Sequence, residues 1–192
     1  DQTAQSVPLG SQAPALLVVD TGVSHSLADG AFAQRRAECE QASALLGVKT
    51  LRDVRPEQLS RLNGEMVAHR RATHVVSENE RVRDAVAAIA QGQWDRMGGL
   101  MRASHRSLRD DYEVSCRELD LLAELATAER GVYGARMTGG GFGGCVILLV
   151  ETDQREAVAD SISDQYHDRI GWAPRCYLVQ ASAGAREICA AL

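Results

Sequence analysis

Lysine is almost missing from this sequence of 192 residues, because 20 of the 21 basic residues are arginine and Lys49 is the only lysine. Lys49 follows Val48, so the sequence lacks the glycine-lysine pair that a Walker A phosphate-binding loop requires. Basic residues are also fewer than acidic ones, 21 against 26, and the net charge of -5 argues against a general nucleic-acid-binding surface. Two common ways of binding phosphate groups are therefore not expected.

Long hydrophobic runs and clustered cysteines are missing too. The longest apolar stretches, Ala13–Val19 and Cys145–Val150, are far shorter than the roughly 20 residues of a membrane-spanning helix. The five cysteines are scattered and odd in number, and neither they nor the five histidines show the spacing of metal ligands. We therefore predict a reduced, cytoplasmic protein without a membrane helix, and we predict no metal site.

The amino terminus has neither the basic start nor the apolar centre of a signal peptide, and it lacks an initiator methionine. We take the missing methionine as an indication that the chain begins inside a longer protein. With 45% hydrophobic and 24% charged residues, the composition is that of a globular protein. No linker or repeat divides the sequence, so we expect one domain over residues 1–192.

Hydrophobic spacing and turn residues predict an alternation of strands and helices. Strands are expected at residues 15–19, 134–138, 145–150 and 175–180, and helices at residues 28–46, 56–62, 65–90, 94–108, 115–131 and 153–170. The two long helices, 65–90 and 94–108, are expected to pack as a hairpin. The interpretation is an α+β fold, in which a helical layer covers one face of a mostly antiparallel sheet.

The same spacing predicts which helix faces are buried. The expected apolar positions are Phe32, Cys39, Ala42 and Leu45 in the first helix, Val75, Val82, Val86 and Ile89 in the first long helix, and Trp94, Met97, Met101, Ser104 and Leu108 in the second. Gly47 is expected to end the first helix as a C-terminal cap. Ser115 and Glu118 have the spacing of a capping box, which predicts that the helix of residues 115–131 begins there.

The most informative segment is a loop in which glycine occupies five of the six positions from Gly139 to Gly144. Glycine loses more backbone freedom on folding than any other residue, so such a cluster indicates positive φ angles or a very close approach of the backbone. Consecutive exposed amides in a loop of this kind form a concave site for an anion, typically a phosphate. The alternative is a flexible connection between two antiparallel strands, although a hairpin needs only one or two glycines.

A dinucleotide-binding loop is not expected, although Gly139, Gly141 and Gly144 formally satisfy the G-x-G-x-x-G pattern. A Rossmann loop leads from a strand into the helix whose N-terminus holds the pyrophosphate. Here the glycines lead directly into the apolar strand of residues 145–150. The context therefore excludes the Rossmann interpretation.

Other polar pairs carry no predicted chemistry. Ser104-His105 and Asp110-Asp111 are sequence neighbours on a helix, and such neighbours do not face each other. The aspartates are expected at the end of the helix, where they act as caps or interact with its dipole. The pairs Arg35-Arg36 and Arg70-Arg71 are expected to be solvated or to belong to ion-pair networks.

Four segments together resemble the galactokinase family, within the larger group of GHMP kinases. They are His25–Leu27 (HSL), Arg35–Cys39 (RRAEC), Ser104–Cys116 (SHRSLRDDYEVSC) and Gly134–Cys145 (GARMTGGGFGGC). Their order and spacing are similar to the carboxy-terminal half of that family. The resemblance implies that residues 1–192 are a ferredoxin-like GHMP kinase C-terminal domain and that the amino-terminal half, with its sugar-recognition motif, its serine-rich nucleotide loop and its base aspartate, is absent.

In the family that it resembles, ATP and Mg²⁺ support transfer of the γ-phosphoryl group to the anomeric hydroxyl of galactose. The resemblance implies no catalytic residue in this chain, and it implies a loop beside the substrate and the phosphates. That loop consists of Thr138, Gly139, Gly140, Gly141, Phe142, Gly143 and Gly144. On the sugar side it implies Phe32, where the family usually has a tyrosine, and Ser24, where an arginine is common in some members.

The leading hypothesis is the carboxy-terminal domain of a galactokinase, inactive alone, with galactose or a related sugar, ATP and the missing half as partners. A non-enzymatic sugar-sensing or regulatory relative is one alternative. A kinase for another sugar, such as a galactosamine derivative, is the other, because Phe32 lacks the phenol hydroxyl. We also expect the chain to self-associate, because the missing half would normally cover part of its apolar surface.

Overall fold

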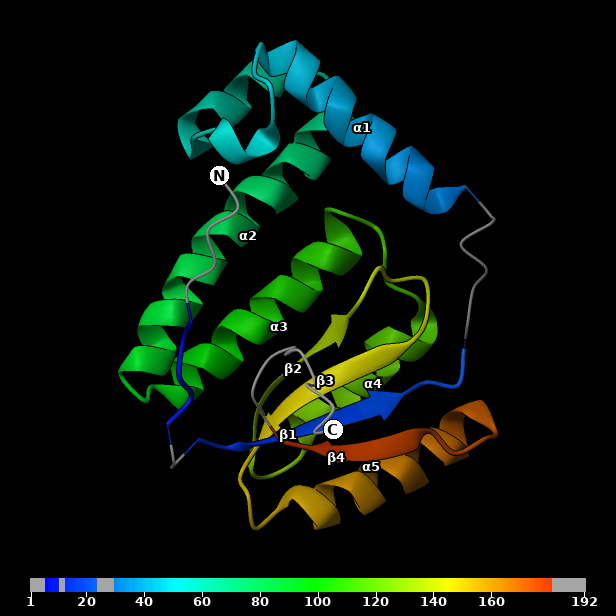
Figure 1. The fold of residues 1–192 in the computed structure, drawn as a ribbon. Coiled ribbons are helices and arrows are strands. Elements are labelled where there is room, and N and C mark those ends of the chain that lie inside the picture. Colours follow the sequence, from blue (N-terminus) through cyan, green and yellow to red (C-terminus); the bar gives the residue numbers. More distant parts are fainter. Residues whose placement is uncertain (1–5, 11–12, 24–29, 181–192) are drawn as a thin grey trace, which may run out of the picture.

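The computed structural model describes residues 6–10, 13–23 and 30–180. Four strands form one sheet in the order β2-β3-β1-β4, and every neighbouring pair is antiparallel (Figure 1). The strands are β1 (Ala15–Asp20), β2 (Val132–Thr138), β3 (Cys145–Val150) and β4 (Arg175–Val179). This order, with helices between β1 and β2 and between β3 and β4, is the ferredoxin-like arrangement that the family resemblance implied.

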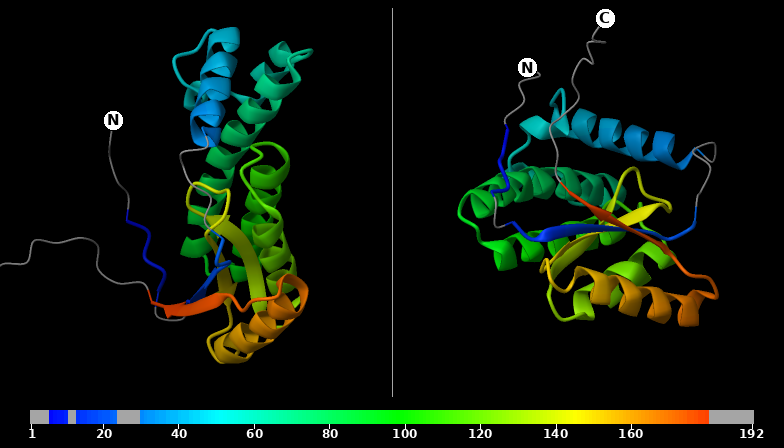
Figure 2. Two further views of the ribbon diagram at one scale, coloured as in Figure 1. Left: turned by 90° about the vertical axis from the view of Figure 1, so that its right-hand side faces the viewer. Right: turned by 60° about the horizontal axis from the view of Figure 1, so that its bottom comes forward.

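Helices α4 (Arg117–Ala128) and α5 (Arg155–Ile170) cover one face of the sheet (Figure 2). The central strand β1 places Leu17 opposite Leu148 and Val19 opposite Val146, and none of these four side chains is more than 1% exposed. Leu119 and Leu122 of α4 pack against this apolar layer and are equally buried. The predicted α+β fold, with helices on one face of an antiparallel sheet, is therefore confirmed.

The remaining helices form an arm that extends from the sheet (Figure 1). They are α1 (Ala31–Leu46), the 3-10 helices η2 (Leu51–Asp53) and η3 (Pro56–Leu62), α2 (Met66–Ala90) and α3 (Trp94–Asp110). A second apolar cluster holds α1, η2, η3 and the first half of α2 together. Helices α2 and α3 pack against each other, so the predicted hairpin is confirmed.

The arm joins the sheet where α3 packs along the edge strand β2. A Cβ atom on Gly98 would lie 1.9 Å from the carbonyl oxygen of Tyr133, and one on Gly134 would lie 2.3 Å from that of Gly98. No side chain fits between the two backbones, because real Cβ atoms essentially never approach within 3.0 Å. The pair Gly98 and Gly134 therefore sets the distance between α3 and the sheet.

The predicted apolar faces are correct for α3 and partly wrong for α1 and α2. Met101, Ser104 and Leu108 are buried as expected, whereas Phe32, Leu45 and Val82 are about half exposed. The buried positions of α1 and α2 are instead filled by small apolar residues and by polar residues with internal partners. They include Ala42, Ser43 and Leu46 of α1 and Ala68, Arg71, Ala72, His74 and Val76 of α2.

The helix ends also differ in part from expectation. Gly47 caps α1 in the left-handed conformation, with a φ of 69°, as predicted. The capping box at Ser115 and Glu118 is wrong, because the N-cap of α4 is Cys116 and no side chain caps it. Ser115 instead donates its hydroxyl to Asp120 Oδ1 at 2.6 Å. The Asp120 carboxylate lies within α4, and the Ser115 hydroxyl binds it and does not cap the first turn of the helix.

Candidate functional site at the glycine loop

The loop Thr138–Gly144 connects the antiparallel strands β2 and β3. Its backbone is left-handed over most of its length, since Gly139, Gly141, Phe142 and Gly144 have φ angles of 86°, 87°, 62° and 86°. Glycine adopts such angles without penalty, which explains the composition of the loop. The strand-loop-strand context also confirms that this is no Rossmann loop.

Hydrogen bonds fix the second half of the loop to two other parts of the chain. Phe142 donates its N–H to the carbonyl oxygen of Val114 at 2.7 Å. The carbonyl oxygen of Gly144 accepts from the N–H and the hydroxyl of Thr21, at 3.0 and 2.8 Å, and the Gly144 N–H donates to Val23. A Cβ atom on Gly141 would lie 2.2 Å from the carbonyl oxygen of Val114. The loop is therefore positioned and is not a free connection.

The first half of the loop is open. Thr138, Gly139 and Gly140 are exposed, and no heavy atom of the described residues lies within 4 Å of a Cβ built on Gly139 or Gly140. Within the described part of the chain, the N–H groups of Gly139, Gly140 and Gly141 make no backbone hydrogen bond. Available N–H groups of this kind can bind a negatively charged ligand, such as a phosphate oxygen.

The segment Ser104–Cys116 supports the loop through the carbonyl oxygen of Val114 and also binds the strand that leads into the loop. His105 accepts the N–H of Met137, in β2, on Nδ1 at 3.2 Å, and its Nε2 lies 3.2 Å from Asp120 Oδ1. Because Nδ1 is the acceptor, the proton of the neutral imidazole is on Nε2 and faces the carboxylate. His105 thus connects α3, α4 and the strand that leads into the loop.

Asp120 is held in its charged form at this junction. Burial disfavours the charge, but hydrogen bonds from His105 and Ser115 outweigh burial and lower the pKa of the Asp120 carboxyl. Glu78 of α2 shows the same balance, since Ser104 and Arg81 donate to it and its pKa is also lowered. The supporting segment is therefore held by charge-assisted hydrogen bonds.

A second group of polar residues covers the other side of the segment Ser104–Cys116. The rings of His74 and Tyr112 stack with centroids 4.5 Å apart, and His74 Nδ1 lies 3.0 Å from the hydroxyl of Ser107. Ser107 in turn donates to Asp111 Oδ2 at 2.7 Å, so it accepts from His74. Burial lowers the pKa of His74 to about 4, which keeps the ring neutral near pH 7.

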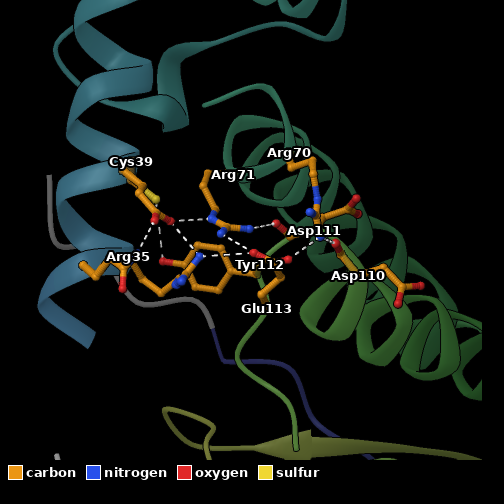
Figure 3. A network of polar contacts seen from close by, with 10 residues as sticks. Arg35, Cys39, Arg70, Arg71, Asp110, Asp111, Tyr112 and Glu113 are labelled. Carbon is orange, nitrogen blue, oxygen red and sulfur yellow. Dashed lines mark hydrogen bonds and ion pairs between the residues drawn. The ribbon is translucent and has the colours of Figure 1, made fainter. Parts of the chain in front are cut away.

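A network of arginines and glutamates joins this segment to α1 and α2 (Figure 3). Arg71 is buried, with 2% of its side chain exposed, and it contacts Glu38 of α1 and Glu113 of the segment. Arg70 also binds Glu113, at 2.8 Å, and Arg35 binds Glu38 at 2.7 Å. These arginines were expected to be solvated or to belong to ion-pair networks, and Arg35, Arg70 and Arg71 belong to such a network. Arg36 forms an exposed pair with Glu40.

The residues predicted on the sugar side are placed only in part. Phe32 lies in the first turn of α1 and is 56% exposed. Figures 1 and 2 show the glycine loop extending toward this end of α1. Ser24 lies outside the described residues. Within the described part of the chain, no group of three or more His, Cys, Asp or Glu residues is placed to hold a metal ion.

Sequence reasoning missed Arg71, Glu113 and Val114 as parts of the site. Val114 acts through its backbone carbonyl, which no pattern of side chains reveals. Arg71 occupies a helix position that hydrophobic spacing treats as polar and therefore exposed. The available signal was the unbroken resemblance over residues 104–116, which includes two of the three.

Comparison with protein families identifies the fold. Residues 85–168 match the family model described as GHMP kinases C terminal. Over these residues the chain is similar to the C-terminal domain of GHMP kinases. The matched residues begin within α2 and include α3, α4, β2, the glycine loop, β3 and most of α5.

Curated relatives narrow the comparison to galactokinases. The chain is 45% identical to the galactokinase of Homo sapiens and to that of Bos taurus, over 95% of this chain and 46% of each relative. It is 43% identical to the galactokinase of Streptomyces coelicolor, over 98% of this chain and 50% of that protein. The chain spans about half the length of the curated relatives that it matches, and the matched half is the carboxy-terminal one.

Solved structures give the same result. The Lactococcus lactis galactokinase complexed with galactose is 34% identical, with a TM-score of 0.88 over 94% of this chain and 48% of that one. The L. major mevalonate kinase in complex with R-mevalonate is 25% identical, with a TM-score of 0.59 over 90% of this chain and 44% of that one. The chain is thus more similar in structure to this galactokinase than to this mevalonate kinase. No helix among the described residues is long and apolar enough to cross a membrane.

Proposed function

We propose that this chain is the carboxy-terminal half of a galactokinase, which transfers the γ-phosphoryl group of ATP to the anomeric hydroxyl of galactose. The observation that carries the proposal is the match over 94% of the chain to a galactokinase complexed with galactose, at a TM-score of 0.88. The proposal takes residues 1–192 as one GHMP kinase C-terminal domain. A cytoplasmic location stays a prediction from the scattered cysteines.

In this proposal the chain contributes the wall of the active site that contains the glycine loop. Phosphoryl transfer depends mainly on positioning and on stabilising negative charge, and ATP supplies the phosphoryl group. The N–H groups of Gly139, Gly140 and Gly141, which make no backbone hydrogen bond in the described part of the chain, and the hydroxyl of Thr138 face the phosphate side. The one aromatic residue of the loop, Phe142, packs against the core and holds the loop in place.

On the sugar side, the proposal places Phe32 and Ser24. Phe32 carries no hydroxyl, so it offers the sugar an apolar contact and no hydrogen bond. For Mg²⁺, the described residues do not form a site, and we derive no step through the ion from this chain. In the proposal, Mg²⁺ and the base aspartate belong with ATP and the amino-terminal half.

The test is a hybrid enzyme in which this chain replaces the matching half of the Streptomyces coelicolor galactokinase. We expect the hybrid to phosphorylate galactose in a coupled assay and the chain alone to give no turnover. A folded hybrid that binds galactose without phosphorylating it would favour the sugar-sensing alternative. Robust turnover by the chain alone would contradict the proposed incompleteness.

The missing phenol of Phe32 favours testing a second substrate class. The hybrid is assayed with galactose and with galactosamine derivatives, alongside its Phe32→Tyr variant. A higher kcat/KM for galactose than for the derivatives supports the galactokinase assignment, and the opposite order supports a kinase for another sugar.

Analytical ultracentrifugation of the chain alone tests the expected self-association, which a monomer at all concentrations would contradict.

A further inference from the structure

Two residues with positive φ angles lie at or next to one hydrogen bond of the glycine loop. Among the described residues, Glu113 and Phe142 are the non-glycine residues with positive φ, at 54° and 62°. The carbonyl oxygen of Val114, directly after Glu113, accepts the N–H of Phe142 at 2.7 Å. Left-handed backbone at such residues persists only where the surroundings enforce it, and it gathers at functional sites. The contacts that hold Glu113 and Phe142 in the left-handed conformation therefore bear on the shape of the glycine loop.

The buried guanidinium of Arg71 is placed to enforce the conformation of Glu113. Its Nη2 lies 2.5 Å from Glu113 Oε2, and its Nη1 donates to the carbonyl oxygen of Asp111. Its Nε lies 2.6 Å from Glu38 Oε2, on α1. The planar guanidinium presents its donors in a fixed geometry, which an ammonium group cannot reproduce. Arg71 thus binds both sides of the turn that ends at Val114.

We propose that Arg71 is a positioning residue for the glycine loop. It holds Glu113 in the left-handed conformation, Glu113 places the carbonyl oxygen of Val114, and that oxygen holds Phe142. Figure 3 shows the first step, in which the Arg71 guanidinium contacts Asp111 and Glu113. The second step is the hydrogen bond from the Phe142 N–H to the carbonyl oxygen of Val114. The competing explanation is structural: Arg71 only joins α1 to α2 through Glu38.

The test is residue-resolved hydrogen exchange on the whole chain with the Arg71→Lys variant. The matched control is Arg36→Lys, which changes an exposed arginine that pairs with Glu40 on α1. We expect the Phe142 amide to exchange at least about tenfold faster in Arg71→Lys, equivalent to about 1.4 kcal/mol of lost protection. The Val146 amide of β3 is expected to keep its protection in both variants. Equal acceleration of both amides, or none, would overturn the proposal.

Two further variants separate positioning from joining α1 to α2, and they remain informative if Arg71→Lys does not fold. Glu113→Gln weakens the contacts of Arg71 and Arg70 with the residue before Val114, together with a longer contact of Arg35 at 3.5 Å, and leaves Glu38 in place. Glu38→Gln weakens the contacts of Arg71 and Arg35 on α1 and leaves Glu113 in place. Selective acceleration of the Phe142 amide in Glu113→Gln and not in Glu38→Gln supports positioning. The reverse pattern would overturn it.

The consequence for catalysis rests on the proposed function. In the hybrid enzyme, Arg71→Lys is expected to raise the KM for ATP and leave the KM for galactose unchanged, because the loop faces the phosphates. Equal increases in both KM values would contradict the positioning role. The exchange measurement needs no enzymatic activity, so a negative result there overturns only the positioning role of Arg71. Failure of the unmodified hybrid to phosphorylate galactose would overturn only the proposed function.

Discussion

Alanine substitutions along the glycine loop separate the cost of positive φ from the cost of close contact. Gly141 has a φ of 87°, and its Cβ would lie 2.2 Å from the carbonyl oxygen and 2.8 Å from the Cβ of Val114. Gly139 has a φ of 86° but no described atom within 4 Å of its Cβ. Gly140 has neither feature, since its φ is not positive and its surroundings are open. The three positions therefore form an internally controlled series.

The expected magnitudes follow from these differences. A left-handed conformation costs an alanine about 1–2 kcal/mol relative to glycine, and forcing extra atoms into a packed site costs about 1–3 kcal/mol. Gly139→Ala is therefore expected to lower the free energy of unfolding by about 1–2 kcal/mol, and Gly141→Ala by about 2–5 kcal/mol. Gly140→Ala is expected to change it by less than about 0.5 kcal/mol.

Urea denaturation of each variant, followed by circular dichroism, measures these free energies. The informative comparison is between Gly141→Ala and Gly139→Ala, because both have nearly the same φ and only one meets Val114. Equal losses at the two positions would refute the close contact between the loop and Val114. A large loss at Gly140 would refute the open first half of the loop.

Three further predictions concern stability. Gly98→Ala is expected to destabilise the protein by at least about 2 kcal/mol, because the added Cβ meets the backbone of β2. Gly99→Ala in the same helix is expected to be neutral or stabilising by up to about 1 kcal/mol. Thermal melting of both variants checks this difference in sign. Because the pKa of His74 is lowered in the folded protein, the unfolded chain binds more protons as the pH falls. Stability that is present above pH 6.5 is therefore lost as the pH falls toward 4, by up to about 3 kcal/mol. His74→Gln is expected to flatten the dependence of the free energy of unfolding on pH, measured by urea titrations. Phe32→Ala is expected to change the free energy of unfolding by less than about 0.5 kcal/mol, since the ring is more than half exposed, and a loss above about 2 kcal/mol would show that the ring is packed.

Hydrophobic spacing predicted the elements better than it predicted their faces. The strands of residues 15–19 and 145–150 appear at the expected positions because each is a short continuous apolar run. The two long helices appear as expected because their apolar residues recur at helical spacing. The buried face of α2 was missed because Arg71 and His74 occupy it, and spacing treats such residues as solvent-exposed. Their burial depends on partners about 30 to 40 positions away in the sequence, such as Ser107 and Glu113.

The candidate site also combines features that the sequence predicted with features that it did not. The glycine content of the loop predicted its left-handed backbone, which is a local property of the chain. The contact between Gly141 and the carbonyl of Val114 was not predictable, because it arises from the packing of two segments that are distant in sequence. The resemblance to galactokinases named residues 104–116 without explaining them. The structure explains them as the support of the loop.

The most direct test of the central claim is the product formed by the hybrid of this chain with the amino-terminal half of the Streptomyces coelicolor galactokinase. Phosphorus NMR of the reaction with galactose and ATP reports whether phosphate is attached and at which hydroxyl. The account predicts phosphorylation at the anomeric oxygen by the hybrid and none by either half alone. A folded hybrid that leaves galactose unphosphorylated would contradict it.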